Sequence, residues 1–174
     1  AYLDQDNSLL PAGNFTTIRA GATAAQTFVV GFPGTLSSVS VVVDPRGTPG
    51  ANLDLEIQST SGGVATGTVL ASASLAPFGG VNPTVTFDVS GAGLAVNAGD
   101  VLAFVLRSNA SLGNDYLLRI ISGNRYAPGQ CTDSGGGIAP GAGWDTIFKT
   151  RVEPATLPGG PGTSDQLNNP APTN

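Results

Sequence analysis

The side chains best suited to binding a ligand gather around one glycine-rich stretch, from about 125 to 143. Tyr126 lies near its start, and Trp144, the only tryptophan, directly follows it. An exposed aromatic ring stacks on the face of a sugar, and nearby amide and guanidinium groups bind the sugar hydroxyls. The pattern therefore predicts a glycan site, and the alternative is that Trp144 caps the open end of the hydrophobic core. The polar groups available to such a site are Asn124, Arg125 and Gln130.

Two carboxylates, Asp133 and Asp145, flank the same stretch. Calcium prefers oxygen ligands of this kind, but the Asp-x-Asp-x-Asp-Gly spacing of a calcium loop is absent. A hydrolytic pair would need two carboxylates about 5 to 10 Å apart in a cleft, which spacing in the sequence does not give. We therefore expect solvated turn aspartates and no cofactor, with a structural calcium ion near the loop ends as the alternative.

The residues that the chain lacks exclude most catalytic chemistry. It has no histidine, so Ser-His-Asp and Cys-His nucleophiles and histidine-ligated zinc are excluded. With a single cysteine, Cys131, neither an intrachain disulfide nor a multi-cysteine metal site can form. The interpretation is a protein that is not an enzyme. Cys131 is either buried or free to form an intermolecular disulfide in an assembly.

Charge is sparse and slightly negative. Charged residues make up 11% of the 174 residues and the net charge is -5, so the basic clusters that bind nucleic-acid phosphates are missing. No run of about 18 apolar residues occurs, which predicts that no segment spans a membrane. The absence of methionine indicates a processed chain. We expect secretion, to an extracellular or periplasmic location, after removal of a signal peptide.

The elements that position these residues are strands. Apolar and polar residues alternate in 53–59, 85–89 and 148–152, which is the pattern of half-buried antiparallel strands. Short β-branched runs at 27–30, 39–43, 101–106 and 116–121 indicate more central strands, and 68–74 is a weaker candidate. Glycine and proline turns separate the runs. The prediction is an all-β, two-sheet antiparallel sandwich, jelly-roll-like, of about eight strands. Its expected core is Phe28, Val41, Leu55, Ile57, Phe87, Phe104, Leu106 and Phe148.

The composition divides the chain into a sandwich domain, 1–153, and a Pro/Gly-rich C-terminal arm, 154–174. The arm has few large apolar side chains beyond Leu157 and Leu167. Burying two leucines returns roughly 3 to 6 kcal/mol, whereas ordering the backbone costs about 1 to 2 kcal/mol per residue. We therefore expect the arm to lie along a neighbouring subunit, as an added strand or a polyproline-like arm, rather than on its own domain.

Several short motifs occur in a characteristic order: Leu3-Asp4-Gln5, Ala25-Gln26-Thr27-Phe28, Leu55-Glu56-Ile57, Thr66-Gly67-Thr68-Val69-Leu70-Ala71, Val96-Asn97-Ala98-Gly99-Asp100, Tyr126, Trp144 and Asp145-Thr146-Ile147-Phe148-Lys149-Thr150. Together they resemble a β-sandwich domain of secreted and surface-exposed bacterial proteins, of the choice-of-anchor or carbohydrate-binding-like type. The resemblance covers about residues 1 to 153. It implies an exported module with a carbohydrate-binding or adhesive role.

These observations lead to two functional hypotheses. In the first, the chain is a non-catalytic extracellular structural or adhesive subunit that contacts other protein subunits, like or unlike, through its surface and its arm. In the second, it is a glycan-binding module that uses the 125–145 loop. The lone Cys131 and the two leucines of the arm are the expected assembly contacts in the first hypothesis.

Overall fold

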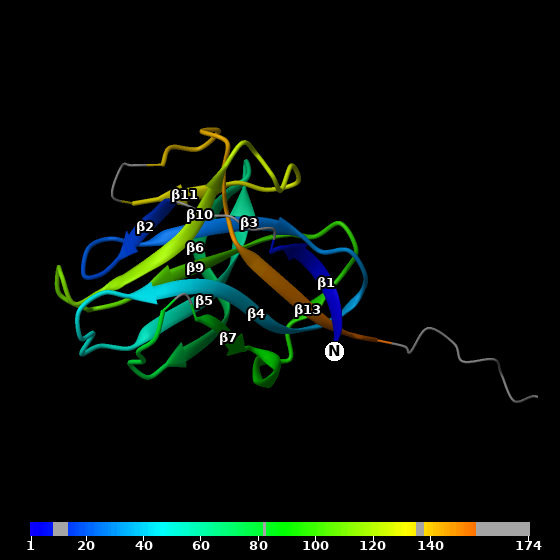
Figure 1. The fold of residues 1–174 in the computed structure, drawn as a ribbon. Coiled ribbons are helices and arrows are strands. Elements are labelled where there is room, and N and C mark those ends of the chain that lie inside the picture. The colour runs from blue at the N-terminus through cyan, green and yellow to red at the C-terminus, as the bar shows by residue number, and fades with distance from the viewer. Residues whose placement is uncertain (9–13, 82, 135–137, 156–174) are drawn as a thin grey trace, which may run out of the picture.

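The protein folds almost entirely into β-strands. The computed structural model describes residues 1–8, 14–81, 83–134 and 138–155, and within these it has thirteen strands and one short 3-10 turn, η1 (Ser90–Ala92) (Figure 1). All strand pairs are antiparallel, as the alternating sequence patterns predict.

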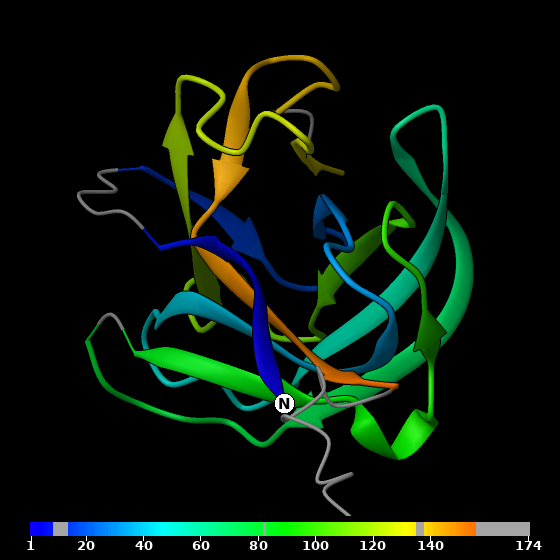
Figure 2. The same ribbon diagram turned by 90° about the vertical axis from the view of Figure 1, so that its right-hand side faces the viewer.

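The strands form two sheets that pack face to face (Figure 2). The eight-stranded sheet has the order β1-β13-β4-β10-β12, with β2 also beside β10 and with β7 and β8 also beside β4. Its strands are β1 (Tyr2–Asn7), β2 (Asn14–Ile18), β4 (Gly34–Pro45), β7 (Thr84–Asp88), β8 (Ala95–Val96), β10 (Tyr116–Ser122), β12 (Trp144–Thr146) and β13 (Phe148–Pro154). The five-stranded sheet has the order β11-β3-β9-β5-β6. It contains β3 (Ala24–Val29), β5 (Leu53–Ser61), β6 (Val64–Leu75), β9 (Val101–Arg107) and β11 (Cys131–Asp133).

The two-sheet sandwich is confirmed, but the number of strands is thirteen rather than about eight. All eight predicted segments lie in strands: β3, β4, β5, β6, β7, β9, β10 and β13. The five additional strands lack a readable apolar alternation. β8, β11 and β12 have only two or three residues each, and β1 is a polar strand that pairs with β13 through a register shift.

The core lies between the sheets and contains every side chain predicted for it. Three phenylalanines connect the two layers. Phe28 and Phe104 come from the five-stranded sheet and Phe148 from the eight-stranded sheet, and the Phe104 and Phe148 rings meet edge to face at 5.4 Å. Edge-to-face aromatic pairs add to the stabilisation that burial provides. These three rings therefore fix how the sheets face each other.

The last described strand, β13, ends at Pro154. Leu157 and Leu167, the predicted apolar contacts of the arm, lie outside the described residues. Within the described part of the chain, no helix has the length and apolar character needed to cross a bilayer.

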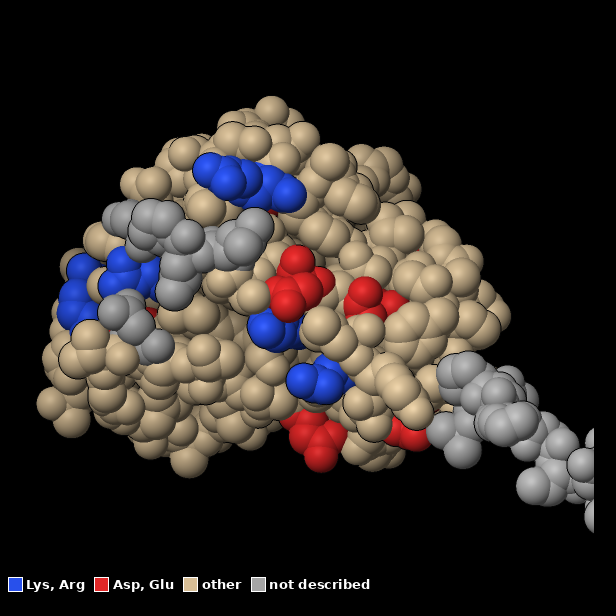
Figure 3. Space-filling model, turned by 45° about the vertical axis from the view of Figure 1, so that its right-hand side comes forward, with Lys and Arg blue, Asp and Glu red and all other residues tan. Residues whose placement is uncertain are grey.

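Charged side chains are few and interleaved. Figure 3 shows acidic and basic groups side by side on one face of the molecule. Several form ion pairs, among them Lys149 with Asp6 on the neighbouring strands β13 and β1. The described surface on this face therefore presents no broad region of one sign.

Candidate functional site

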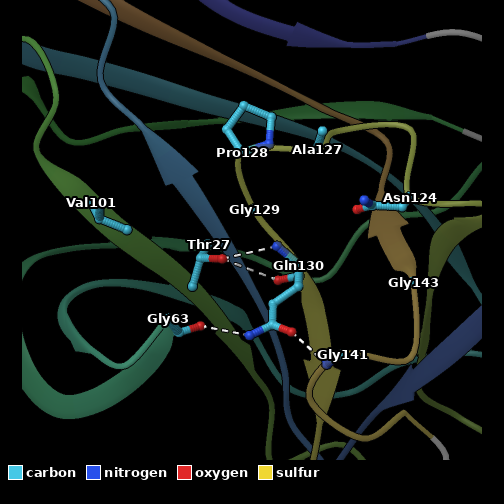
Figure 4. Close-up of a pocket in the computed structure, with 10 residues that line it drawn as sticks. All are labelled: Thr27, Gly63, Val101, Asn124, Ala127, Pro128, Gly129, Gln130, Gly141 and Gly143. Carbon is cyan, nitrogen blue, oxygen red and sulfur yellow. Dashed lines mark hydrogen bonds between the residues drawn. The ribbon is translucent and has the colours of Figure 1, made fainter.

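The predicted loop borders a pocket of about 460 Å³ at one end of the sandwich (Figure 4). Of the five residues expected to bind a ligand there, Asn124 and Gln130 line it, whereas Tyr126, Arg125 and Trp144 do not. The full lining is Thr27, Gly63, Val101, Asn124, Ala127, Pro128, Gly129, Gln130, Gly141 and Gly143. The pocket therefore has polar amides, a small apolar wall and no aromatic ring.

Gln130 holds three segments together at this pocket. Its side-chain Nε2 donates to the Gly63 carbonyl at 2.9 Å, and its Oε1 accepts from the Gly141 backbone N–H at 2.6 Å. Its own backbone N–H donates to Thr27 Oγ1 at 2.9 Å. Figure 4 shows these bonds running from one residue to the β5–β6 hairpin, the loop and β3. With both ends of the amide engaged, Gln130 acts first as a structural bridge.

Asn124 is the freer of the two amides. Its backbone has φ 48°, a left-handed conformation that costs a non-glycine residue energy but that asparagine tolerates best. Its backbone N–H donates to the Gly143 carbonyl at 2.9 Å, while its side-chain amide forms no hydrogen bond with the described residues. Asn124 is therefore the pocket residue with a free donor and acceptor.

Tyr126 does not present the exposed ring that a sugar would need, so this prediction is wrong. The residue is only 8% exposed, and its ring packs edge to face on Phe148 at 5.1 Å. Its hydroxyl accepts from the Val29 N–H at 3.0 Å and donates to Gln5 Oε1 at 2.9 Å. Burial raises the pKa of the hydroxyl. Tyr126 is a core residue that ties the loop to β3 and β1.

Trp144 also takes a packing role. It lies half-buried against a small apolar cluster of Ile120, Cys131 and Ile138, which is separate from the main core. The alternative, that Trp144 caps the open end of the core, holds only in that the ring packs on apolar groups, because these form a cluster separate from the main core. Arg125, the remaining predicted ligand, is exposed and lies outside the pocket lining.

The carboxylates predicted as metal ligands are engaged by protein donors instead. Asp145 is fully buried, with Oδ2 accepting from the Tyr126 N–H at 2.8 Å and Oδ1 from Gln26 Nε2 at 3.2 Å. Burial raises its pKa. Asp133 accepts from Thr16 Oγ1 at 2.9 Å and from the Ile138 N–H at 3.2 Å. In the described residues, no group of three or more His, Cys, Asp or Glu side chains gathers around either carboxylate.

Cys131 is not available as an assembly contact, which corrects that prediction. It is 1% exposed and packs on Ile120 and Ile138 in the cluster below Trp144. Burial, with smaller contributions from the negative charges of Asp133 and Asp145, raises the pKa of its thiol to about 12. A buried, protonated thiol does not form intermolecular disulfides.

The second surface of note is the open edge of the five-stranded sheet. β6 ends this sheet, pairs with β5 alone and runs for 12 residues, so its other side carries unpaired backbone groups. Figure 2 shows the β5–β6 hairpin as the tall teal element at the right of the molecule. The strand Val-Ala-Thr-Gly-Thr-Val-Leu-Ala-Ser-Ala-Ser-Leu has no charged residue and no proline. Val69 and Leu70 are 48% and 39% exposed on it.

The other edges of the described sheets are better protected. β11, at the opposite edge of the same sheet, has three residues and ends at Asp133. β1 carries Asp4 and Asp6, and β12 has three residues. β2, β7 and β8, which each pair with one strand only, have five, five and two residues. Short strands and charges are the usual protection against edge-to-edge pairing. Among the described strands, β6 is the long edge that lacks both.

The sequence contained a signal for this edge that strand prediction alone does not use. An uncharged run of 12 residues is unusual for an edge strand in a soluble domain, but nothing local indicates which strand lies at an edge.

Comparison of the chain with family models and with curated proteins finds no match.

Proposed function

We propose that the chain is a non-catalytic extracellular module with a structural or adhesive role, which contacts another protein chain by adding a strand at β6. The observation that supports this is the combination of length, exposed apolar residues and absence of charge on an unpaired edge. Such an edge is a template for a further strand.

The physical gain from pairing is substantial. The regular pairing of β6 with β5 runs over Ala71–Leu75, because register shifts interrupt it between Ala65 and Ala71. Alternate residues of this regular part direct their N–H and C=O groups outward and are available to a partner. Each backbone hydrogen bond made there contributes about 0.5 to 1.5 kcal/mol net. Val69 and Leu70 are exposed to water in the single chain. Burying their apolar surface against the partner stabilises the pair further.

The glycan alternative has less support. The pocket at the loop end has no aromatic platform, because Tyr126 is buried and Trp144 packs on its own cluster. No carboxylate, thiol or lysine lines this pocket. Export and a relationship to surface-exposed bacterial sandwich domains remain part of the proposal, on the motifs given above.

The test is retention of labelled protein on the surface of the cells that produce it. We expect Leu70→Lys to abolish retention, because a charge on an edge strand opposes strand addition. The matched control is Leu112→Lys, which makes the same change at a loop leucine that is 70% exposed. Both leucines are exposed, so neither variant removes a core contact.

Two treatments of the cell surface separate a protein partner from a glycan. Protease treatment should remove the binding, while periodate oxidation of sugars should leave it intact. If periodate or Asn124→Ala removes retention and Leu70→Lys does not, the glycan hypothesis replaces this proposal.

A further inference from the structure

We propose that the partner at this edge is a second copy of the chain, whose β6 pairs antiparallel with β6 across a two-fold axis. The inference rests on the proposed function, since it uses the same edge. The pairing would join the five-stranded sheets of two copies into one continuous sheet. Two-fold association of identical surfaces is the commonest form of protein assembly.

β6 is complementary to itself. A two-fold axis places equivalent residues of the two copies near each other, so any charge on the strand would meet its own sign. Residues 64–75 carry none. The Ala71-Ser72-Ala73-Ser74 run, in the second half of β6, has side chains small enough for two backbones to approach. A pairing centred on Ser72 places exposed Val69 opposite Leu75 of the second copy.

The geometry also explains why association would stop at two copies. Continued growth of the sheet needs a second long edge, and the opposite edge is β11, with three residues and the carboxylate of Asp133. A β6 to β11 contact would therefore be short. Pairing of β6 with β6 centred on Ser72 uses residues 69–75 of both copies. It leaves only residues 64–68, a short stretch that a register shift interrupts, so no long edge remains for a third copy.

The C-terminal arm is a weaker candidate for the same edge. It contains five prolines, and no more than eight consecutive residues, 162–169, are free of them. Proline has no N–H to give to a strand ladder. β6 contains no proline, and alternate N–H groups of its regularly paired part face away from β5.

Analytical ultracentrifugation of the full chain tests the inference. We expect the wild type and Leu112→Lys to sediment as dimers and Leu70→Lys as a monomer.

Disulfide cross-linking is the second test, in which Leu70→Cys, Ser72→Cys and Ser74→Cys are each oxidised separately. Opposed residues in an antiparallel pair have Cα atoms about 4.5 to 5.5 Å apart, within reach of a disulfide, so the position at the axis should cross-link most. Buried Cys131 stays in place and should not react.

A wild-type monomer, or cross-linking that is equally weak at all three positions, would overturn the inference. A dimer that survives Leu70→Lys but is lost on removal of 156–174 would assign the contact to the arm. If the wild type is a monomer while Leu70→Lys still abolishes retention on cells, the edge binds an unlike protein, and only the second-copy inference fails.

Discussion

The Gln26 side-chain amide and the Asp145 carboxylate lie on different sheets and meet at 3.2 Å inside the sandwich. Both residues are fully buried. The other end of the same amide, Gln26 Oε1, accepts from the Thr146 N–H at 2.7 Å. From the other sheet, Gln26 thus supplies hydrogen-bond partners to two groups of β12, the Asp145 carboxylate and the Thr146 backbone N–H. The loop end is held to the five-stranded sheet by this polar contact as well as by apolar packing.

Replacing Gln26 with leucine should therefore destabilise the fold by about 3 kcal/mol. Leucine keeps the approximate size but leaves the Asp145 Oδ1 and the Thr146 N–H without their partner, and each buried polar group left unpaired costs about 1 to 3 kcal/mol. Denaturant unfolding measures the change. The control is Thr86→Val, which removes an exposed hydrogen bond to Ser40 and should cost less than about 0.5 kcal/mol. Equal effects would show that Gln26 has no special role.

Stability should depend on Cys131 at alkaline pH. Burial raises the pKa of its thiol from 9.0 to about 12, so between these values the unfolded chain loses a proton that the folded chain keeps. The contribution is fully present below pH 9 and is lost as the pH rises toward 12.

The measurement is the free energy of unfolding from pH 9 upward for wild type and Cys131→Ala. The slope of the wild type should be more negative by up to about 1.4 kcal/mol per pH unit. All other ionisable groups are common to the two proteins, so their contributions cancel in the difference. If the free energies of unfolding of the wild type and Cys131→Ala fall in parallel with pH, the raised pKa of the Cys131 thiol is contradicted.

The sequence predicted the sandwich because its core strands alternate visibly. The same alternation held the signal for Gln26, since it lies two residues from Phe28 and so faces the same side of the strand. A polar residue on a core-facing position needs a partner, but its identity, 119 residues away in Asp145, has no local trace.

The loop residues were misassigned for a related reason. Tyr126 lies in a glycine-rich stretch, where nothing local indicates burial, yet its hydroxyl bonds to Gln5, 121 residues earlier in the chain. Trp144 starts a strand of three residues, too short to show a period. Contacts between distant segments decide which loop side chains are buried, and composition carries no information on them. The short strands β8, β11 and β12 were missed on the same ground.

Gly129 should tolerate no side chain. A Cβ placed there would lie 1.9 Å from the Thr27 carbonyl oxygen, a backbone atom that cannot move without disturbing β3. We expect Gly129→Ala to destabilise the fold by about 1 to 3 kcal/mol, the usual cost of overpacking. Gly79→Ala is the control, because nothing lies within 4 Å of the position and its φ is not in the left-handed region. That variant should be neutral or slightly stabilising in thermal unfolding. Equal losses at both positions would contradict the close approach of loop and strand.

Burial should also decide which ion pairs contribute to the stability of the fold. Arg46 binds Asp115 through two parallel bonds, Nε to Oδ1 at 2.7 Å and Nη2 to Oδ2 at 2.6 Å, and the Asp115 side chain is fully buried. Arg46→Met leaves that carboxylate buried without its cation. Because the Arg46 side chain is itself 38% exposed, we expect a loss at the lower end of the range of about 3 to 5 kcal/mol for breaking a buried pair. Arg107→Met is the matched control, because Arg107 is 45% exposed and its partner Glu56 is 25% exposed. An exposed pair of this kind contributes up to about 1 kcal/mol. Chemical unfolding of the two variants at neutral pH gives the comparison. The Arg46 variant should lose several times more stability, and similar losses would mean that water reaches Asp115 once the guanidinium is gone.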